Sequence, residues 1–309
     1  MKDTKIMSLS QAIKKFVHNG DCIALGGCTT NRKPYAAVRE IIKQGIKEFH
    51  IEGGAAGGDI DLLIGSGCCK SMNNSYCANS GFSNVSRRYR KFIEENKIAI
   101  EDYSLDVQMI LYHAAALGLP YVPVKHMIGS DLVNKWGMSK EYRRNSQKVS
   151  NEKLIVTCNP FNLQEKICLI PTPSIDVAII HVQKAASDGT ARIEGSVFAD
   201  VDLSIAAKYC ILTCEELLEV EDIRRDPHLN HICSLSVNAI VHLPFGAHPS
   251  QVYNYYDYDK DFLRLYDEVS KEDHLFEKFT RDWIFDIKDH TEYLNKLGKS
   301  RLSTIKIKK

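Results

Sequence analysis

Residues 22–34 read CIALGGCTTNRKP, and residues 49–59 read FHIEGGAAGGD. Each stretch begins with a short apolar strand and then runs into adjacent glycines, Gly26 and Gly27 in the first and Gly53 and Gly54 in the second. Glycine lets the backbone turn tightly and lets its N–H groups approach a ligand closely. Neither stretch contains GxGxxG or GxxxxGK[ST], so neither is a nucleotide-binding fingerprint. The pair suggests either a cleft that handles a phosphate or a thioester, or ordinary strand-to-helix turns of an α/β fold.

Helical patterns flank these strands. Ser8 and Gln11 have the spacing of a capping box, and apolar residues then recur at helical intervals up to Val17. Pro34 suits the first position of a second helix, which Gly45 ends. The same pattern of start and stop signals predicts a helix over 107–117, for which Ser104 is a plausible N-cap and Gly118 the terminating glycine.

The second half of the chain contains short apolar runs of the kind found in covered parallel sheets, at 177–182, 209–213 and 239–243, with a helix near 202–208. Strands that alternate with helices predict an α/β fold with an open, largely parallel sheet flanked by helices. From about residue 259 the chain becomes polar and helical. We therefore expect a single domain over 1–309, with 259–309 as a mainly helical C-terminal extension.

Composition limits the partners. The chain has 309 residues with 40 basic and 39 acidic side chains, a net charge of +1, and no sustained basic stretch. Such a balance provides no field for nucleic acid or an anionic membrane, so small molecules and proteins are the expected partners. No stretch approaches 18 apolar residues and the first residues show no signal-peptide pattern, which predicts a cytoplasmic protein.

The ten cysteines are spaced irregularly, and CxxC is absent. Several lie inside apolar strands, so we expect buried free thiols in a reducing compartment rather than disulfides. A zinc site requires clustered cysteine and histidine ligands, and the sequence shows no such cluster. The prediction is that the protein has no metal and no cofactor.

A self-sufficient active site is not apparent in the sequence. There is no GxSxG nucleophile elbow, and no cysteine is singled out by a neighbouring histidine. His181 lies within an apolar strand and is more typical of a satisfied core histidine, whereas His248 follows a strand end and could line a pocket. Arg87 and Arg88 could clamp a carboxylate or could simply belong to a solvated helix face.

Runs along almost the whole chain carry a resemblance to a known family. They include VHNGDCIALGG, NRKPYAAV, GGAAGGD, ANSGFSNVSRRYRKF, EDYSLDV, HAAALGLP, DVAIIH, TCEE, IRRDP, PFGAHPSQ, YDYD and DHTEYLNKLG. In these runs the chain resembles the alpha subunits of the glutaconate CoA-transferases, which belong to family I of the CoA-transferases. The chain departs from the family at its end, since it stops at Lys309 where a longer tail is expected.

The resemblance implies a two-chain enzyme in which the catalytic glutamate lies on a beta subunit, in a Glu-Asn-Gly type motif. This chain contains no such motif, and Glu52-Gly53 and Glu194-Gly195 are only superficially similar. The implied reaction converts acetyl-CoA and (E)-glutaconate to acetate and glutaconyl-CoA, within glutamate fermentation. CoA thioesters are then substrates rather than cofactors. The resemblance also implies that this chain forms a hetero-oligomer with the beta subunit and is inactive without it.

The resemblance also supplies candidate site residues. Ser104 matches a position where related transferases place an oxyanion-hole side chain. Substrate and CoA binding would involve the glycine loops, through backbone donors of the four glycines, and polar residues near them: Gly26, Gly27, Thr29, Arg32, Lys33, Gly53, Gly54, Ser80 and Asn84. Arg32 and Lys33 could equally lock the first loop through ion pairs.

Three alternatives stay open. Steroid-ring hydrolases that act on cyclic CoA thioesters share the fold and the RKP run, but they have an acid where this chain has Ser104. A non-catalytic subunit that only shapes the specificity of its partner is the second alternative. A phosphosugar isomerase of related sheet topology is the least favoured, because its acid and base residues have no match in this sequence.

Overall fold

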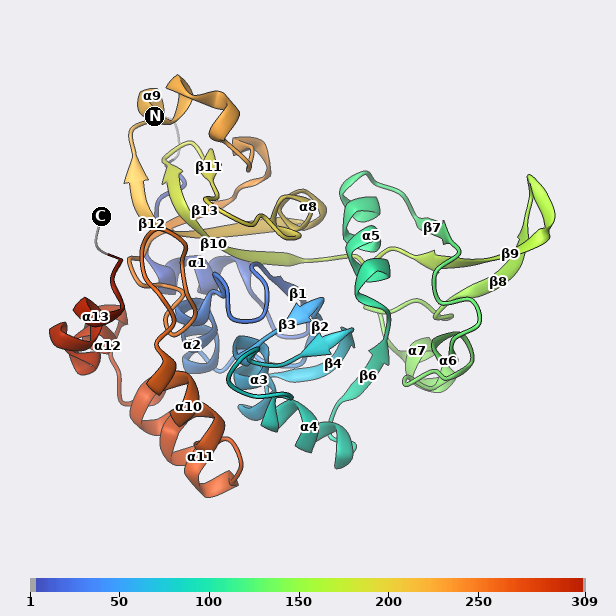
Figure 1. Ribbon diagram of the computed structural model, residues 1–309, viewed down its shortest axis with the longest axis horizontal. Coiled ribbons are helices and arrows are strands. Elements are labelled where there is room, and N and C mark those ends of the chain that lie inside the picture. The colour runs from blue at the N-terminus through green and yellow to red at the C-terminus, as the bar shows by residue number, and fades with distance from the viewer. Residues whose placement is uncertain (1–3, 308–309) are drawn as a thin grey trace.

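The computed structural model describes residues 4–307. Its centre is an eight-stranded sheet in the order β13-β12-β10-β1-β2-β4-β6, with β11 attached to β10 (Figure 1). Every pairing along this path is parallel, and only the β10–β11 hairpin is antiparallel. The strands are β1 Cys22–Leu25, β2 Phe49–Glu52, β4 Cys69–Asn74, β6 Ala99–Asp102, β10 Val177–Ala186, β11 Ala191–Arg192, β12 Tyr209–Leu218 and β13 Ala239–His242. The predicted open, largely parallel α/β sheet is confirmed.

Alternation along the strands sends side chains into two separate cores. On β1, Ile23 and Leu25 join a core on one face, whereas Cys22 and Ala24 join a core on the other. The first face is covered by α1 Leu9–Phe16, α2 Tyr35–Lys43, α3 Gly58–Gly65 and the C-terminal helices. The second is covered by α5 Leu105–Ala116 and α8 Asp200–Ala206. Helices on both faces explain why the central strands are buried along their length.

The local signals near the N-terminus are confirmed in detail. The Ser8 side chain accepts from the Gln11 backbone N–H, and the Gln11 side chain accepts from the Ser8 N–H, which completes the capping box of α1. Gly45 and Gly118 follow α2 and α5 with φ of +70° and +73°, in the left-handed conformation that glycine adopts without strain. Pro34 differs from the prediction by one position, because it is the N-cap of α2 rather than its first residue.

Residues between β6 and β10 form an arm that the sequence patterns did not predict (Figure 1). Here α5 leads to a three-stranded antiparallel sheet in the order β7-β9-β8, made of Tyr121–Val124, Asn162–Pro171 and Ile155–Asn159. Two short helices, α6 Asp131–Asn134 and α7 Lys140–Asn145, lie between β7 and β8. The hairpin is polar at many positions and mostly exposed, so it lacks the continuous apolar run that marks a covered strand.

The C-terminal region is helical, as expected. It contains α10 Lys260–Val269, α11 Asp273–Thr280, the π-helix η3 Arg281–Phe285, α12 His290–Leu297 and α13 Lys299–Ile305. The remaining elements are α4 Arg87–Glu94, α9 Val220–Arg225, the 3-10 helices η1 Pro227–Leu229 and η2 Ser234–Ser236, and the two-stranded sheet of β3 Ala55–Ala56 and β5 Tyr76–Cys77. None of the described helices is long and apolar enough to cross a membrane.

The expected free thiols are also confirmed. All ten cysteines are free, and only Cys158 and Cys233 are exposed. Most of the others lie in the two cores, where burial raises the pKa of thiols such as Cys210, to about 12. These thiols remain neutral at physiological pH and are poor nucleophiles.

Candidate functional site

The strand order marks one edge of the sheet as a ligand site. From β1 the chain builds outward through β2, β4 and β6, and later from β1 in the opposite direction through β10, β12 and β13. The order therefore reverses between β1 and β10, and ligands of open α/β sheets bind beyond the carboxyl ends of the strands at such a point. The first glycine loop, residues 26–33, leaves the sheet at this position. The loops after β2, β4 and β6 emerge along the same edge.

Asp200 holds the first glycine loop in place. Its Oδ1 accepts the N–H of Gly27 at 2.8 Å, and its Oδ2 pairs with the Arg32 guanidinium at 2.6 Å. Arg32 also donates to the carbonyls of His181 and Ser196. The carboxylate and the guanidinium are both buried, so a charge-assisted network with no access to water fixes the loop.

A second ion pair and a loop-to-loop contact complete this arrangement. Lys33 Nζ lies 3.1 Å from Asp59 Oδ2, and both side chains are fully buried. The Thr29 N–H donates to the Ala55 carbonyl at 3.1 Å, which joins the first glycine loop to the chain that follows the second. Arg32 and Lys33 therefore form ion pairs that lock the first glycine loop, which is one of the two roles considered for them above.

The structure corrects one expectation about the glycines. The N–H of Gly26 donates to Ile179, that of Gly27 to Asp200 and that of Gly53 to Asn73, so these three groups are not available to a thioester oxygen. Gly27 instead has a conformational role, since its φ is +71° and an added Cβ would lie 2.2 Å from the Asn31 carbonyl oxygen. Among the four glycines, only Gly54 stays a candidate backbone donor.

Ser104 occupies the N-cap position of α5, but its side chain makes no capping hydrogen bond. The hydroxyl oxygen is buried and has no partner of good geometry, although it lies near Asp106 and lowers the pKa of that carboxyl. One turn along the helix, Gln108 is buried with both amide atoms unpartnered. Native proteins rarely leave buried polar atoms unpaired, and these atoms are typical of positions that bind water or a ligand.

The remaining sequence candidates lie further out. Ser80 and Asn84 are exposed on the loop that joins β5 to α4, and the Ser80 hydroxyl lies 3.2 Å from the Tyr76 hydroxyl. Arg87 pairs with Asp267, and Arg88 pairs with Asp273. These arginines therefore tie α4 to the C-terminal helices instead of clamping a substrate carboxylate.

The two histidines considered above are both fully buried and hydrogen-bonded. His181 contacts Thr213 and Glu215, which fits the interpretation as a core histidine. His248 bonds Tyr293 through Nδ1 and Asp259 through Nε2, so it does not line a pocket. Burial lowers the pKa of His248 to about 4, against the opposing effect of Asp259.

The depressed pKa of His248 predicts acid sensitivity. An unfolded histidine binds a proton near pH 6.5, whereas folded His248 binds one only near pH 4, so the unfolded state takes up more protons between these values. The stabilising contribution is complete above pH 6.5 and is lost as pH falls toward 4. We expect His248→Gln to flatten the pH dependence of the unfolding free energy across this window, measured by urea denaturation. An identical slope in the wild-type and variant proteins would contradict the assignment.

The carboxylates near the two glycine loops are all engaged within the chain. Asp200 pairs with Arg32, Asp59 with Lys33, Glu52 accepts from Asn73, and Glu215 bonds His181 and Tyr256. None of these four carboxylates is left as a free, accessible nucleophile.

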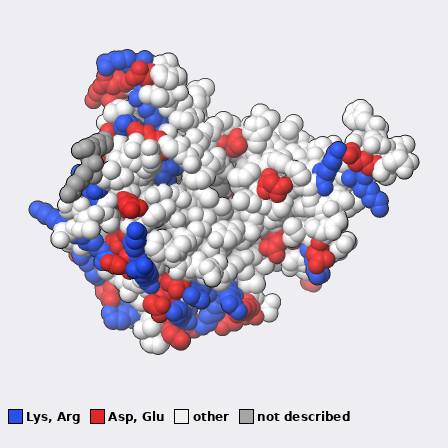
Figure 2. Space-filling model, viewed as in Figure 1, with Lys and Arg blue, Asp and Glu red and all other residues white. Residues whose placement is uncertain are grey.

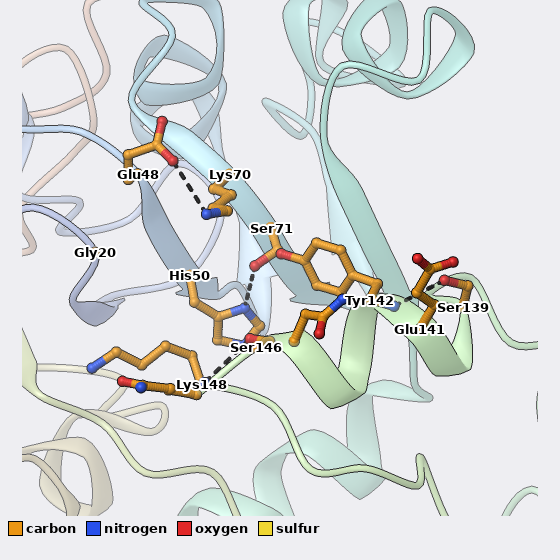
Figure 3. Close-up of a pocket in the computed structure, with 12 residues that line it drawn as sticks. Gly20, Glu48, His50, Lys70, Ser71, Ser139, Glu141, Tyr142, Ser146 and Lys148 are labelled. Carbon is orange, nitrogen blue, oxygen red and sulfur yellow. Dashed lines mark hydrogen bonds and ion pairs between the residues drawn. The ribbon is translucent and has the colours of Figure 1, made fainter.

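A second hollow lies at the opposite edge of the sheet. A cavity of about 630 Å³ opens beside Gly20, Glu48 and Lys70, which precede β1, β2 and β4 or lie at their start (Figure 3). Its other wall is the segment around α7, with Tyr142 and Lys148. This cavity is separate from the glycine loops, which follow the same strands at their carboxyl ends.

Comparisons with known proteins define the class. The coenzyme A transferase family matches residues 6–243, and the chain belongs to this family. It is 55% identical over 98% of its length to the A subunit of glutaconate CoA-transferase from Acidaminococcus fermentans, of which it covers 95%. The crystal structure of glutaconate coenzyme A-transferase from that organism superposes with a TM-score of 0.97, covering 98% of this chain and 96% of the other. A more distant relative, the A subunit of 3-oxoadipate CoA-transferase from Pseudomonas knackmussii, is 30% identical over 96% of this chain and 99% of its own.

These relatives confirm the resemblance drawn from the sequence motifs and the fold that it implied. The chain is a CoA-transferase subunit, and a relative of its full length is one subunit of a larger enzyme. The sequence reasoning missed Asp200, which holds both Gly27 and Arg32. No local signal marks that residue, because its two partners lie more than 160 residues away in the sequence.

Proposed function

We propose that this chain is the alpha subunit of an enzyme that transfers CoA from acetyl-CoA to (E)-glutaconate, giving acetate and glutaconyl-CoA, in glutamate fermentation. The observation that carries the proposal is the 55% identity, over 98% of the chain, to the A subunit of glutaconate CoA-transferase. The partner is a CoA-transferase beta subunit, and the heterodimer assembles into a larger hetero-oligomer. The ten free thiols suit the reducing cytoplasm.

The proposed chemistry uses a glutamate of the beta subunit as nucleophile. Its carboxylate attacks the thioester carbonyl of acetyl-CoA, the C–S bond breaks, and a mixed anhydride and CoA thiolate result. The thiolate then attacks the glutamyl carbonyl, which releases acetate and forms a glutamyl-CoA thioester. Glutaconate repeats the two steps in the reverse sense and leaves as glutaconyl-CoA, with the glutamate regenerated.

This chain supplies the environment for those steps. A carboxylate attacks a thioester poorly in water, and its reactivity rises in a closed cleft with a donor placed at the developing oxyanion. The first glycine loop, held by Asp200, and the buried Ser104 hydroxyl lie at the carboxyl edge where such a cleft would form. We propose that Gly54, Thr29, Ser80 and Asn84 contact the substrates from the same edge. We also propose that Arg32 and Lys33 act by holding the loop.

The surface also suits a partner subunit. In the view of Figure 2 the charged side chains gather near the C-terminal helices, at α9 and along the arm, while the middle of the face carries few. That middle region lies over β1, β3 and α5. Interface cores are depleted in charged residues, so this face is the proposed surface for the beta subunit.

Ser104 gives a test of the oxyanion role. We expect Ser104→Ala to reduce kcat on the order of 10²-fold with little change in KM, the low end of what the loss of one oxyanion donor costs. Because the hydroxyl makes no capping bond to α5, the melting temperature of the complex should change little. Steady-state kinetics and thermal melts of one co-purified complex provide both readouts. A lower melting temperature with unchanged kcat would return Ser104 to a structural role.

Co-expression with the neighbouring open reading frame, followed by a substrate panel, tests the function itself. We expect CoA to pass from acetyl-CoA to (E)-glutaconate, with 3-oxoadipate as the comparison acid. Transfer to 3-oxoadipate alone would replace the proposed acceptor. Thioester hydrolysis without any acid acceptor would favour the ring-cleaving hydrolase alternative.

A further inference from the structure

The sheet face that carries Cys22 becomes unusually polar toward β4 and β6. Because side chains alternate along each strand, Cys22 shares its face with His50 and Glu52 of β2 and with Ser71 and Asn73 of β4. Cys22 lies directly opposite His50 in the register, and His50 lies opposite Ser71. The exposed fractions of Cys22, His50 and Glu52 are 0%, 2% and 5%. Burial of three such groups together is costly unless they serve one another or a ligand.

We propose that Cys22, His50 and Glu52 form a binding site for a divalent transition-metal ion of the zinc type. One ligand atom from each residue, the Cys22 Sγ, a ring nitrogen of His50 and a carboxylate oxygen of Glu52, lies within 4.8 Å of the other two. Thiolate, imidazole and carboxylate are the three ligand types that zinc takes in proteins. Three protein ligands with the fourth position left to solvent is a familiar zinc arrangement.

The separation between His50 and Glu52 fits the site. His50 Nε2 lies 3.3 Å from Glu52 Oε1, at the long end of hydrogen-bond distances. Two ligand atoms that each lie about 2.0–2.1 Å from a tetrahedral zinc ion are about 3.3–3.4 Å apart. The Cys22 sulfur, bonded at about 2.3 Å, would sit roughly 3.5–3.6 Å from each of them, so it has to close at most about 1.3 Å.

Neighbouring groups orient the proposed ligands. Ser71 Oγ lies 2.8 Å from His50 Nδ1 (Figure 3). A proton on Nδ1 donated to that oxygen leaves the Nε2 lone pair directed at Glu52. Asn73 Nδ2 donates to Glu52 Oε1 at 2.8 Å and fixes the carboxylate. Partners of this kind set the tautomer and orientation of metal ligands in known sites. Tyr112 lies beside Glu52, and its buried hydroxyl has no hydrogen-bond partner of good geometry.

One of the three proposed ligands borders a cavity. His50 lines the cavity of about 630 Å³ at the amino edge of the sheet, together with Ser71 and Lys148 (Figure 3). Without a metal the Cys22 thiol is neutral, since burial and the neighbouring Glu52 raise its pKa well above the usual range. Metal binding therefore replaces the thiol proton, which passes to solvent. The cavity opens at the amino edge of the sheet, whereas Glu52, the last residue of β2, directly precedes Gly53 of the second glycine loop.

Cobalt titration of the whole chain tests the site. The parent protein carries Cys158→Ser and Cys233→Ser, which remove the two exposed thiols, and is first stripped with a chelator. We expect one equivalent of Co²⁺ to give a thiolate-to-cobalt charge-transfer band and the visible bands of a four-coordinate ion, and Zn²⁺ to abolish both. In the parent, Zn²⁺ should also raise the melting temperature, because a ligand that binds only the folded state stabilises it.

Variants assign the ligands. Cys22→Ser should lose the charge-transfer band, whereas Cys210→Ser, a buried thiol of the same sheet outside the group, should keep it. His50→Gln and Glu52→Gln should weaken Co²⁺ binding more than Ser71→Ala does. For Ser71→Ala, which removes an orienting partner, we expect about a 10–100-fold loss of affinity. If Cys22→Ser does not fold, the Co²⁺ affinities of the His50 and Ser71 variants test the site instead. Absence of a one-equivalent charge-transfer band in the parent, or the same band in Cys22→Ser, would overturn the site.

Discussion

The chain purified without its partner is expected to show no CoA transfer above a blank reaction. The reason is structural as well as chemical, because Asp200, Asp59, Glu52 and Glu215 at the carboxyl edge are all engaged within the chain. None of them is placed to attack a thioester. Acyl exchange between acetyl-CoA and labelled acetate, measured on the purified chain, is the direct assay.

Complementation supplies the control. Activity should appear when the separately purified beta subunit is added, and a Glu→Gln change in the Glu-Asn-Gly type motif of that subunit should remove it. Turnover by the isolated chain, clearly above the blank, would show that the nucleophile lies in this chain. Full activity of the isolated beta subunit would instead reduce this chain to a shaping role.

Asp200→Ala is expected to have the second largest effect. Arg32 would then remain buried without its counter-charge, and removal of one partner from a buried pair costs roughly 3–5 kcal/mol of folding stability. The Gly27 N–H would also lose its acceptor. A displacement of about 1 Å at a site costs on the order of 10²-fold in rate, so we expect a loss of that size in kcat/KM.

Two further variants separate charge burial from loop position. In Arg32→Met/Asp200→Ala no buried charge is left unpaired, so urea denaturation should show much of the stability restored while activity stays low. Asp202→Ala is the control, because it removes a carboxylate two residues after Asp200 in α8 that pairs with the exposed His113. It should change the free energy of unfolding by no more than about 0.5 kcal/mol. Wild-type kinetics in Asp200→Ala would refute the positioning role.

The fold was predictable because its signals are local. The capping box of α1, the glycine ends of α2 and α5 and the apolar runs of β1, β10 and β13 each lie within a dozen residues. Strand ends were less accurate, since β10 continues to Ala186 and β12 to Leu218 through polar residues. Those residues remain in the sheet because the parallel register between the two strands continues to their ends.

The candidate site was only partly predictable. Family motifs placed Gly27, Arg32 and Ser104 at one edge of the sheet. They did not reveal that the Asp200 carboxylate accepts the hydrogen bond of the Gly27 N–H. Nor does sequence spacing bring Cys22 near His50, because that proximity comes from strand register. Such pairings depend on how distant segments meet, and the sequence pattern of either segment alone contains no record of the other.

The C-terminal helices have a consequence for synthesis of the chain. Side chains of α10 and α11, such as Phe262 and Phe279, complete the same core that α2 and α3 begin some 200 residues earlier. While a ribosome extends the chain, that apolar face of the nascent sheet stays uncovered until the last helices emerge. A core that is completed by segments so distant in the sequence folds slowly, and its intermediates expose apolar surface that promotes aggregation. Chaperone dependence and insolubility of products that stop before α10 are therefore expected traits of this chain, whatever its substrate.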